Sequence, residues 1–537
     1  MKTCLELAKG LGIDQRYIQP YGWDKAKINL EYYKEIEDRP TGKLVLVTAI
    51  TPTKAGEGKT TTTIGLHDGL RRIGVNSLAV LREPSLGPVF GVKGGAVGAL
   101  KSTIVPSDDI NLHFTGDFHA LTSTINLIAA IIENHIFQGN ELGINPNRIV
   151  WTRALDMNDR SLRKITVTSE DSKHSITHES EFVITVASEL MAIFCIANDE
   201  EEFLDRTEKI IVAYTYDEKP VTVKELNIRG AIKKLMHTAM SPNIVQTLEE
   251  NPVLVHGGPF ANIAHGCNSL IATKMALKLA PIVVTEAGFA ADLGAEKFFD
   301  IKCREGKLHP SLVVIVATIR ALKLHGGKAL DKISEEDVNA LIAGTDNLAQ
   351  HISNMKKFGL PIIVAINHFE TDTDEEIRVL TEWCEKKGVD VIFCDGYLKG
   401  GEGAIDLAKK VVEVLNNSEP HFKLLYNQDL TIKEKIDIIC KQIYRANSVV
   451  YTEEAEWKIK DIEYIGYSKL PICMAKTPLS FSDDPNLIGA PRNFKITIRD
   501  VNLSAGAGFI VALTGKIMTM PGLPAVPAAV KMEDEEL

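Results

Sequence analysis

The chain of 537 residues is longer than a single hydrophobic core usually supports, so its length predicts two or three domains. Hydrophobic residues make up 45% of it and charged residues 24%, which excludes a disordered or fibrous protein. The net charge of −11 argues against nucleic acid or an anionic membrane as a general partner, because both are bound by surplus Lys and Arg.

Cysteine usage and the N-terminal residues predict a soluble, cytoplasmic protein. The eight cysteines are scattered without a C-x-x-C pair, so we expect reduced, buried thiols. Cys394 lies near a glycine-rich loop and is either functional or a small core residue. The N-terminus lacks an apolar signal core, and no window approaches the roughly 18 apolar residues of a membrane span. We therefore expect small-molecule substrates and no membrane partner.

The first segment with a recognisable binding motif is residues 43–73, which are predicted to form a strand, a loop and a helix. Residues 43–50 have the apolar run of a buried parallel strand, and residues 59–73 have the apolar spacing of a helix. The loop between them fits the phosphate-binding pattern G-x-x-x-x-G-K-[ST], except that Thr53 stands at the first glycine. The alternative interpretation is an ordinary glycine-rich turn.

This P-loop predicts how a nucleotide is held. Backbone N–H groups at the start of the helix bind phosphate oxygens, Lys59 adds a positive charge, and the Thr60 hydroxyl can ligate Mg²⁺. The predicted ATP-binding residues are Thr53, Lys54, Ala55, Gly56, Glu57, Gly58, Lys59 and Thr60.

Further strand-like runs alternate with helical stretches along the chain. They lie at residues 75–81, 149–153, 181–185, 253–255, 282–285, 312–317, 361–366, 389–394 and 471–474. Such alternation predicts an α/β fold, with a P-loop NTPase-like, mostly parallel sheet in a large N-terminal domain and two smaller α/β domains. Composition shifts suggest boundaries that give domains at residues 1–345, 346–418 and 419–537.

The loops that follow these strands should build the site, since ligands bind at the carboxyl ends of parallel strands. Arg82 follows the strand after the P-loop helix, and its guanidinium can hold a carboxylate or an acyl phosphate; alternatively, Arg82 and Glu83 pair with each other as structural charges. Phe369 and Tyr397 follow later strands and can stack a flat heterocycle or belong to the core.

Three histidine-containing loops allow weaker interpretations. His113, Asp117 and His119 are spaced as a loose metal site, and structural hydrogen bonding or a helix cap by Asp117 is the alternative. His256 and His265 flank a glycine-rich turn and leave the same choice open.

With these loops assembled, the chain resembles the formate–tetrahydrofolate ligase family, also called formyltetrahydrofolate synthetase, over nearly its whole length. Among the matching stretches are Leu-Arg-Glu-Pro-Ser-Leu-Gly-Pro at residues 81–88 and Ser-Ala-Gly-Ala-Gly-Phe-Ile-Val-Ala-Leu-Thr-Gly at residues 504–515. Thr53 is the residue that the family itself carries at its position.

The resemblance implies a reaction and a set of site residues. The reaction would join formate to N10 of tetrahydrofolate at the expense of ATP, through a formyl phosphate intermediate. ATP, Mg²⁺ and a monovalent cation (K⁺ or NH₄⁺) would be required, and the protein would be a homotetramer. The implied catalytic residues are Lys59, Arg82 and Glu83, and the implied folate pocket comprises Lys101, Thr103, Phe289, Phe369 and Tyr397.

The sequence departs from the family pattern mainly in the expected folate half of the site. Where the family usually has Lys-Gly-Gly-Ala-Ala-Gly-Gly-Gly-Tyr, a small residue and Gln, residues 93–103 replace two glycines by Ala99 and Leu100, the Tyr by Lys101 and the Gln by Thr103. Tyr397 stands where the family usually has Trp. Neutral drift is one interpretation; the others are a diverged paralogue with a changed acceptor or weakened folate activity, and a non-catalytic ATP-binding subunit.

Overall fold

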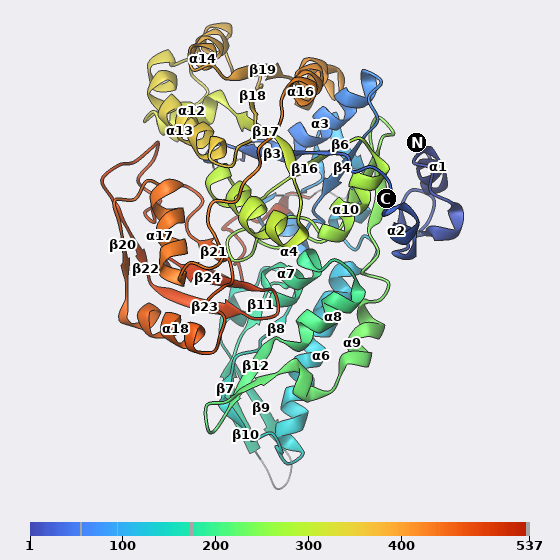
Figure 1. The fold of residues 1–537 in the computed structure, drawn as a ribbon, viewed down its shortest axis with the longest axis vertical. Helices are drawn as coiled ribbons and strands as arrows, with labels where there is room; N and C mark the ends of the chain where they lie inside the picture. Colours follow the sequence, from blue (N-terminus) through green and yellow to red (C-terminus); the bar gives the residue numbers. More distant parts are fainter. Residues whose placement is uncertain (54–55, 94, 171–174, 533–537) are drawn as a thin grey trace.

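The structure is a computed structural model that describes residues 1–53, 56–93, 95–170 and 175–532. Its centre is a twelve-stranded sheet (Figure 1). The main path of the sheet follows the order β1 (Ile18–Pro20), β2 (Ala26–Ile28), β14 (Asn243–Thr247), β15 (Pro252–Val255), β4 (Ser77–Leu81), β16 (Ile282–Glu286), β3 (Lys43–Ala49), β17 (Pro310–Ala317), β18 (Ile362–Asn367) and β19 (Asp390–Cys394). The hairpin of β5 (Gly98–Ala99) and β6 (Ser102–Val105) joins it beside β14.

The seven strands from β15 to β19 along this path run parallel, which confirms the predicted α/β class with a mostly parallel sheet. Helices cover both faces, so the strands are apolar on both sides. In β3, Val45 and Val47 pack toward α3 (Lys59–Arg72) and α16 (Ile405–Asn417), whereas Leu44 and Leu46 belong to the cluster on the opposite face. Both clusters therefore hold the strand that leads into the P-loop.

Several other helices pack around this sheet. They are α10 (Leu270–Leu279), α12 (Ile319–His325), α13 (Val338–Lys356), α14 (Asp374–Lys386) and the short α15 (Gly396–Lys399), with α1 (Cys4–Gly10) and α2 (Glu31–Ile36) at the N-terminus. Each α/β connection returns the chain to the same end of the sheet, so the loops after β4, β16, β3, β17, β18 and β19 lie along one edge.

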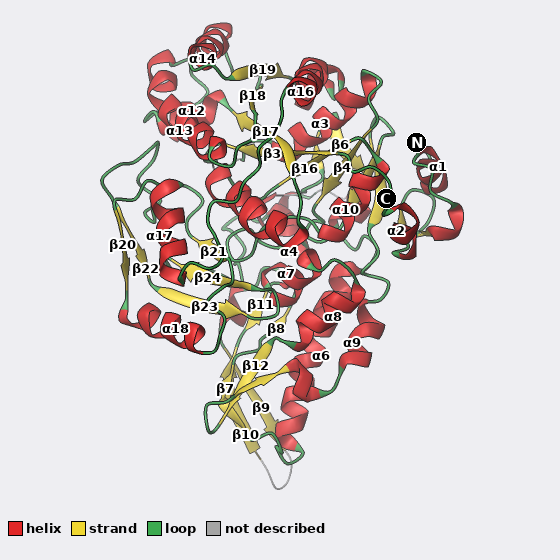
Figure 2. Cartoon of the chain, in the orientation of Figure 1, coloured by secondary structure: helices red, strands yellow, loops and turns green. Residues whose placement is uncertain are grey.

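A second region projects from the sheet and is built from helices and small sheets (Figure 2). Its helices are α6 (Asp117–Phe137), α7 (Glu189–Ile196), α8 (Glu200–Glu208) and α9 (Arg229–Met236), and its strands are β7 (Ile144–Ile149), β8 (Arg153–Ala154), β9 (Ile165–Glu170), β10 (Ser175–Ser180), β11 (Phe182–Val183), β12 (Ile211–Thr215) and β13 (Pro220–Thr222).

Two sequence expectations fail in this region. The runs at residues 149–153 and 181–185 are not strands of the central sheet: the first is interrupted between β7 and β8, and the second contains only β11, which pairs with β8. The main-chain nitrogens of Val150 and Trp151 both donate to the Val212 carbonyl, so the chain bends there although its residues are apolar. Apolar runs alone did not distinguish these short strands from those of a buried parallel sheet.

One helix of this region bears on the expectation that no segment approaches a membrane span. By length and composition α6 could cross a membrane. In the fold it packs against α7, α9 and β8, and its apolar residues Leu121, Ile125, Ile128 and Ile132 are buried in the main core. Its composition is therefore explained by packing within the protein.

The C-terminal region contains α17 (Ile432–Gln442), α18 (Glu453–Tyr464) and two further small sheets. One sheet pairs β20 (Ser448–Tyr451) with β22 (Lys495–Ile498), and the other has the order β21 (Ile472–Ala475), β24 (Phe509–Leu513) and β23 (Asp500–Ser504). The strands β18 and β19 continue the central sheet, so residues 346–418 share a sheet with strands from before residue 345. The two boundaries between the three expected domains stay a prediction.

Candidate active site

The loop after β3 has the backbone that a phosphate cradle requires. Gly56 and Gly58 both lie in the left-handed region, with φ of +79° and +78°. Gly58 is the residue before the first turn of α3, which begins at Lys59, so the loop leads directly into a helix N-terminus. Among the predicted ATP-binding residues, Lys54 and Ala55 lie outside the described residues.

The Glu57 side chain is turned into the protein and fixes the loop from inside. Its carboxylate accepts a hydrogen bond from the Thr53 backbone N–H at 2.6 Å and another from the Thr318 hydroxyl. Burial raises the pKa of this carboxyl above its usual range, and both hydrogen bonds oppose that rise. The Glu57 side chain therefore shapes the loop from inside the protein. Because it points away from the loop surface, only the backbone of Glu57 is left for the predicted nucleotide binding.

A cluster of charges surrounds the start of α3. The Thr60 hydroxyl donates to the Glu286 carboxylate at 2.8 Å, and the Arg82 guanidinium approaches the other oxygen of Glu286 at 3.7 Å. Arg82 directly follows β4 and Glu286 ends the neighbouring strand β16, which in turn lies beside β3. Arg82 thus faces Glu286, and the expected alternative of an Arg82–Glu83 pair is not what the structure forms.

Lys59 is the central cation of this cluster. Desolvation by the surrounding protein lowers the pKa of its ammonium to about 8; Glu286 opposes the decrease, and the positive charges of Arg82 and Lys93 add to it. With Lys59, Arg82 and Lys93 around one carboxylate, the local charge is positive. Such a site attracts phosphate and carboxylate groups.

Glu83 lies next to Arg82 in sequence but enters a different environment. Its carboxyl is buried beside Lys27, Asp117 and Asp156, and burial together with the negative charge of Asp117 raises its pKa well above the usual range. Its backbone N–H donates to the Gly257 carbonyl at 2.9 Å. The predicted catalytic role of Glu83 is therefore not matched by a contact with the Arg82–Glu286 cluster in the described part of the chain.

The loose trio His113, Asp117 and His119 does not form a metal site. Asp117 is buried and binds Lys27 at 2.6 Å and Asn243 at 2.7 Å, whereas both histidines are exposed. Within the described residues, no group of three or more His, Cys, Asp or Glu side chains could hold a metal ion. The structural interpretation of Asp117 as a hydrogen-bonding residue is correct.

The remaining ambiguous residues are structural as well. His256 is buried between the Ser269 hydroxyl at 2.7 Å and the Ala239 carbonyl at 2.8 Å, and burial lowers its pKa to about 4. His265 is also buried, with the Ala192 carbonyl at 3.4 Å. Cys394 is buried in the core, as are the other seven cysteines, all of them free thiols.

The loops after β17 and β18 hold the other side of the P-loop. The Asn367 amide donates to the Glu57 carbonyl at 3.1 Å, and a Cβ at Gly58 would collide with the same amide. The Arg320 guanidinium donates to the Gly56 carbonyl at 2.6 Å and lies 3.9 Å from the centre of the Phe369 ring. These contacts connect the nucleotide loop to an aromatic side chain.

The structure brings together three of the five residues predicted for the folate pocket. The rings of Phe369 and Tyr397 lie 6.5 Å apart, centre to centre, with an angle of 32° between their planes. The backbone N–H of Lys101 donates to the Tyr397 carbonyl at 3.3 Å, and the Lys101 side chain is exposed. Both aromatic side chains are half-buried, so neither belongs to the closed core.

Thr103 and Phe289 occupy other positions. The Thr103 hydroxyl donates to the Leu100 carbonyl at 2.9 Å within the β5–β6 hairpin. Phe289 has φ of +58° in the loop after β16, beside Gly288 and therefore near Arg82. Phe289 forms no aromatic pair with Phe369 or Tyr397 among the described residues, and the part of Thr103 and Phe289 in the pocket stays a prediction.

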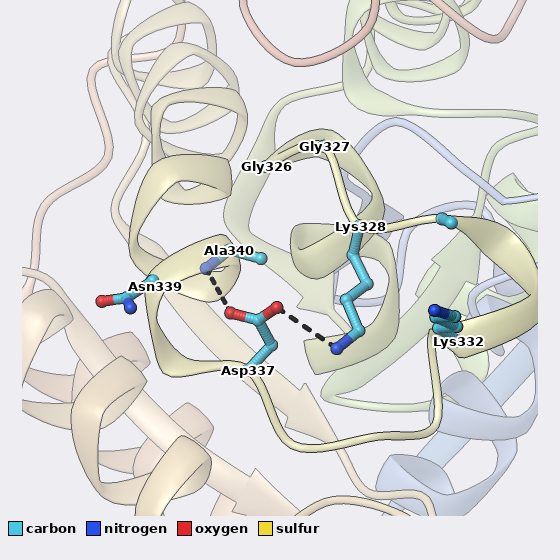
Figure 3. Close-up of a pocket in the computed structure, with 8 residues that line it drawn as sticks. Gly326, Gly327, Lys328, Lys332, Asp337, Asn339 and Ala340 are labelled. Atoms are coloured by element: carbon cyan, nitrogen blue, oxygen red, sulfur yellow. Dashed lines mark hydrogen bonds and ion pairs between the residues drawn. The ribbon is translucent and has the colours of Figure 1, made fainter.

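A shallow hollow of about 560 Å³ lies away from these residues (Figure 3). It is lined by residues after α12 and at the start of α13: Gly326, Gly327, Lys328, Ala329, Lys332, Asp337, Asn339 and Ala340. Lys328 and Asp337 pair at 3.2 Å, and Asp337 also accepts the Ala340 backbone N–H at 2.9 Å. Since Lys328 and Asp337 pair with each other and the hollow contains none of the predicted residues, we do not assign the substrate site there.

Sequence reasoning gave no role to three residues that complete the site. Glu286 ends a strand within a loop of evident chemical interest, but nothing in the sequence paired it with Thr60. Arg320 and Asn367 follow two other strands, and their role depends on β17 and β18 being neighbours of β3. The only available signal was their position just after strand-like runs.

In a comparison with protein-family models, the model described as formate–tetrahydrofolate ligase matches residues 1–536 of the chain.

Proposed function

The chain belongs to the formate–tetrahydrofolate ligase family, ATP-dependent ligases of one-carbon metabolism, and from this premise we propose a two-step reaction through formyl phosphate. A formate oxygen attacks the γ-phosphorus of ATP, the bond to the β-phosphate oxygen breaks, and ADP leaves. N10 of tetrahydrofolate then attacks the formyl carbon, phosphate departs, and N10 loses its proton. The products are 10-formyltetrahydrofolate, ADP and phosphate.

The observation that carries this proposal is the positive cluster at the mouth of the P-loop. Lys59 and the loop amides are placed to stabilise charge on the transferred phosphoryl group. Arg82 offers a planar fork for the formate carboxylate and then for formyl phosphate. Both substrates of the first step are anions, and the surplus of positive charge around Glu286 suits them.

Glu83 has a supporting part in this proposal. Its backbone N–H bond to the Gly257 carbonyl fixes the chain just after β4, next to Arg82, and its carboxyl is buried. Burial and the negative charge of Asp117 raise the pKa of this carboxyl, which favours its neutral form and supports a structural role over that of a general base.

Mg²⁺ fits the residues beside the P-loop. The Thr60 hydroxyl and the Glu286 carboxylate lie 2.8 Å apart, and both are oxygen ligands of the kind that Mg²⁺ prefers. We propose that these two residues hold the ion together with the ATP phosphates. When bound, Mg²⁺ would neutralise charge on the phosphates.

Tetrahydrofolate would bind on the far side of the P-loop from Arg82's strand. Phe369 and Tyr397 provide half-buried rings for a flat heterocycle, and the exposed Lys101 adds a positive charge for the carboxylates of the substrate's glutamate. Phe289 and Thr103 remain candidates for the same pocket.

The direct test is product analysis with purified protein. ATP, formate and tetrahydrofolate together should give 10-formyltetrahydrofolate with one ADP per product, and Arg82→Ala should abolish it while leaving nucleotide binding intact. ATP turnover that depends on formate but not on tetrahydrofolate would favour a changed acceptor. ATP binding without turnover under any condition would instead favour a non-catalytic subunit.

Three further features are proposals at the same level. We propose a homotetramer, tested by light scattering after gel filtration, and a cytoplasmic location, tested by cell fractionation. We also propose activation by K⁺ or NH₄⁺, tested by replacing either ion with Na⁺ in the assay. The described residues contain no cluster of three or more His, Cys, Asp or Glu side chains that could hold a metal ion, and we assign no site to this cation.

A further inference from the structure

Arg320 lies between the nucleotide loop and the aromatic residue proposed to stack the acceptor. It occupies the first turn of α12, directly after β17, and β17 separates β3 from β18 in the sheet. The Thr318 side chain caps α12 by accepting the Ala321 N–H at 3.2 Å, and its hydroxyl binds Glu57. The backbone that carries Arg320 is thus fixed to the inside of the P-loop.

The Arg320 guanidinium makes two different contacts. One terminal nitrogen donates to the Gly56 carbonyl at 2.6 Å, and the plane of the group lies over the Phe369 ring at 3.9 Å. Its Nε–H is buried and has no acceptor among the described residues. The group is therefore held mainly by the loop carbonyl on one side and the ring on the other.

A second connection runs parallel to the first. Asn367, two residues before Phe369, donates to the Glu57 carbonyl and packs against Gly58. A change in the backbone path of residues 56–58 would therefore displace both the Arg320 guanidinium and the backbone that leads to Phe369. In the other direction, a ring displaced by a ligand would act on the carbonyl that shapes the cradle.

We propose that Arg320 is a positioning residue that couples nucleotide binding at the P-loop to binding of the acceptor's ring system at Phe369. Phosphate bound by the loop amides fixes the Gly56 peptide, this fixes the guanidinium, and the guanidinium over the ring fixes the position of Phe369. The coupling is reciprocal, because a factor by which ATP raises acceptor affinity is also the factor by which the acceptor raises ATP affinity. The inference rests on the proposed function, since it requires tetrahydrofolate to bind beside Phe369.

Arg320→Lys separates the two contacts. A lysine ammonium can reach a carbonyl acceptor but has no planar group to stack, so the link to the ring should be lost while the charge remains. We would measure the affinity for tetrahydrofolate by calorimetry, with and without a saturating non-hydrolysable ATP analogue and Mg²⁺. The wild-type protein should bind tetrahydrofolate at least about fivefold more tightly with the analogue present.

The variants should remove this enhancement selectively. In Arg320→Lys the analogue alone should bind within about threefold of wild type, and the enhancement of tetrahydrofolate binding should fall to about one. Phe369→Leu removes the same contact from the other side, so it should also lose the enhancement, and the double variant should show no further loss. Phe369→Leu also provides the test if Arg320→Lys does not fold.

Arg16→Lys is the matched control. Arg16 stacks over Tyr17 at 4.8 Å on an exposed surface, so the same change removes a similar contact far from the site. This variant should keep the wild-type enhancement. An unchanged enhancement in Arg320→Lys, or its absence from a wild-type enzyme that makes 10-formyltetrahydrofolate, would overturn the inference alone. A wild-type protein that makes no such product would overturn the proposed function as well.

Discussion

The lowered pKa of Lys59 predicts an alkaline loss of activity that Lys59→Arg should remove. Lys59 must be protonated to stabilise phosphoryl charge, and desolvation lowers its pKa in the free enzyme to about 8. Activity should therefore be complete below this pKa and decrease as the pH rises through it. At pH 9 about one tenth of the lysine remains protonated, so kcat/KM for ATP should be about tenfold lower than at pH 7.

Bound ATP changes this expectation in a definite direction. The phosphates bring negative charge next to the ammonium, which favours its protonated form and raises its pKa. The decrease in kcat, which reports the enzyme–ATP complex, should therefore begin at a higher pH than the decrease in kcat/KM. An assay of ADP release at saturating formate and tetrahydrofolate, from pH 6 to 10, gives both profiles.

Arginine provides the control because its guanidinium stays protonated over this range. Lys59→Arg should be less active than wild type at pH 7, since the planar guanidinium does not match the geometry of the lysine ammonium. The pH profile of kcat/KM for this variant should nevertheless lack the decrease centred near pH 8. Lys209→Arg, at an exposed lysine, should keep the wild-type profile. A wild-type kcat/KM that stays constant from pH 7 to 10, or a Lys59→Arg variant with the same decrease, would refute the assignment.

Three further sets of substitutions test individual contacts. Gly56→Ala and Gly58→Ala impose the same left-handed strain of about 1–2 kcal/mol, but only the Cβ of Gly58→Ala collides with Asn367. Measured by calorimetry, Gly58→Ala should therefore lose about tenfold more ATP affinity than Gly56→Ala. Adding Asn367→Ala to Gly58→Ala should restore part of that loss. Thr60→Val removes the hydroxyl beside Glu286 and should raise the Mg²⁺ concentration needed for half-maximal activity at least about tenfold; an unchanged Mg²⁺ requirement would exclude Thr60 as a ligand. Glu83→Gln keeps a neutral polar group, so its kcat should stay within about threefold of the wild-type value and its unfolding temperature should be unchanged. A large loss of kcat in a stable variant would instead support the catalytic role predicted from the resemblance.

The nucleotide half of the site was largely predictable from the sequence because its chemistry is local. The apolar strand, the glycine pair, Lys59 and Thr60 follow one another within 18 residues of chain, and the structure places them as a strand, a loop with two left-handed glycines and a helix. Arg82 was also predictable, because it ends the next strand. In each case the residues that act together are neighbours in sequence or in consecutive strands.

The residues that were missed depend on strand order, which the sequence does not display. Glu286 becomes the partner of Thr60 only because β16 inserts between β4 and β3, although about 200 residues separate the two segments. Arg320 meets Gly56 only because β17 flanks β3 on the other side. Apolar periodicity predicts that these segments are strands but carries no information about which strands are adjacent. The same limitation explains why residues 149–153 were expected in the central sheet.

The hairpin at residues 98–103 is fixed by contacts that do not depend on the side chain at residue 101. Leu100 adopts φ of +44° at its turn, and the hairpin is joined to the aromatic side of the pocket by the bond from the Lys101 N–H to the Tyr397 carbonyl. This bond uses only main-chain atoms, so it does not depend on whether residue 101 is a lysine or the tyrosine usual in the family. The hairpin is also held from beneath, since the Ser102 hydroxyl donates to the Gly396 carbonyl at 2.7 Å. A different side chain at residue 101 therefore changes charge and bulk but leaves the main-chain bond between the hairpin and Tyr397 in place. If this face binds the acceptor as proposed, an effect on acceptor use should arise from the Lys101 side chain rather than from a rearranged loop.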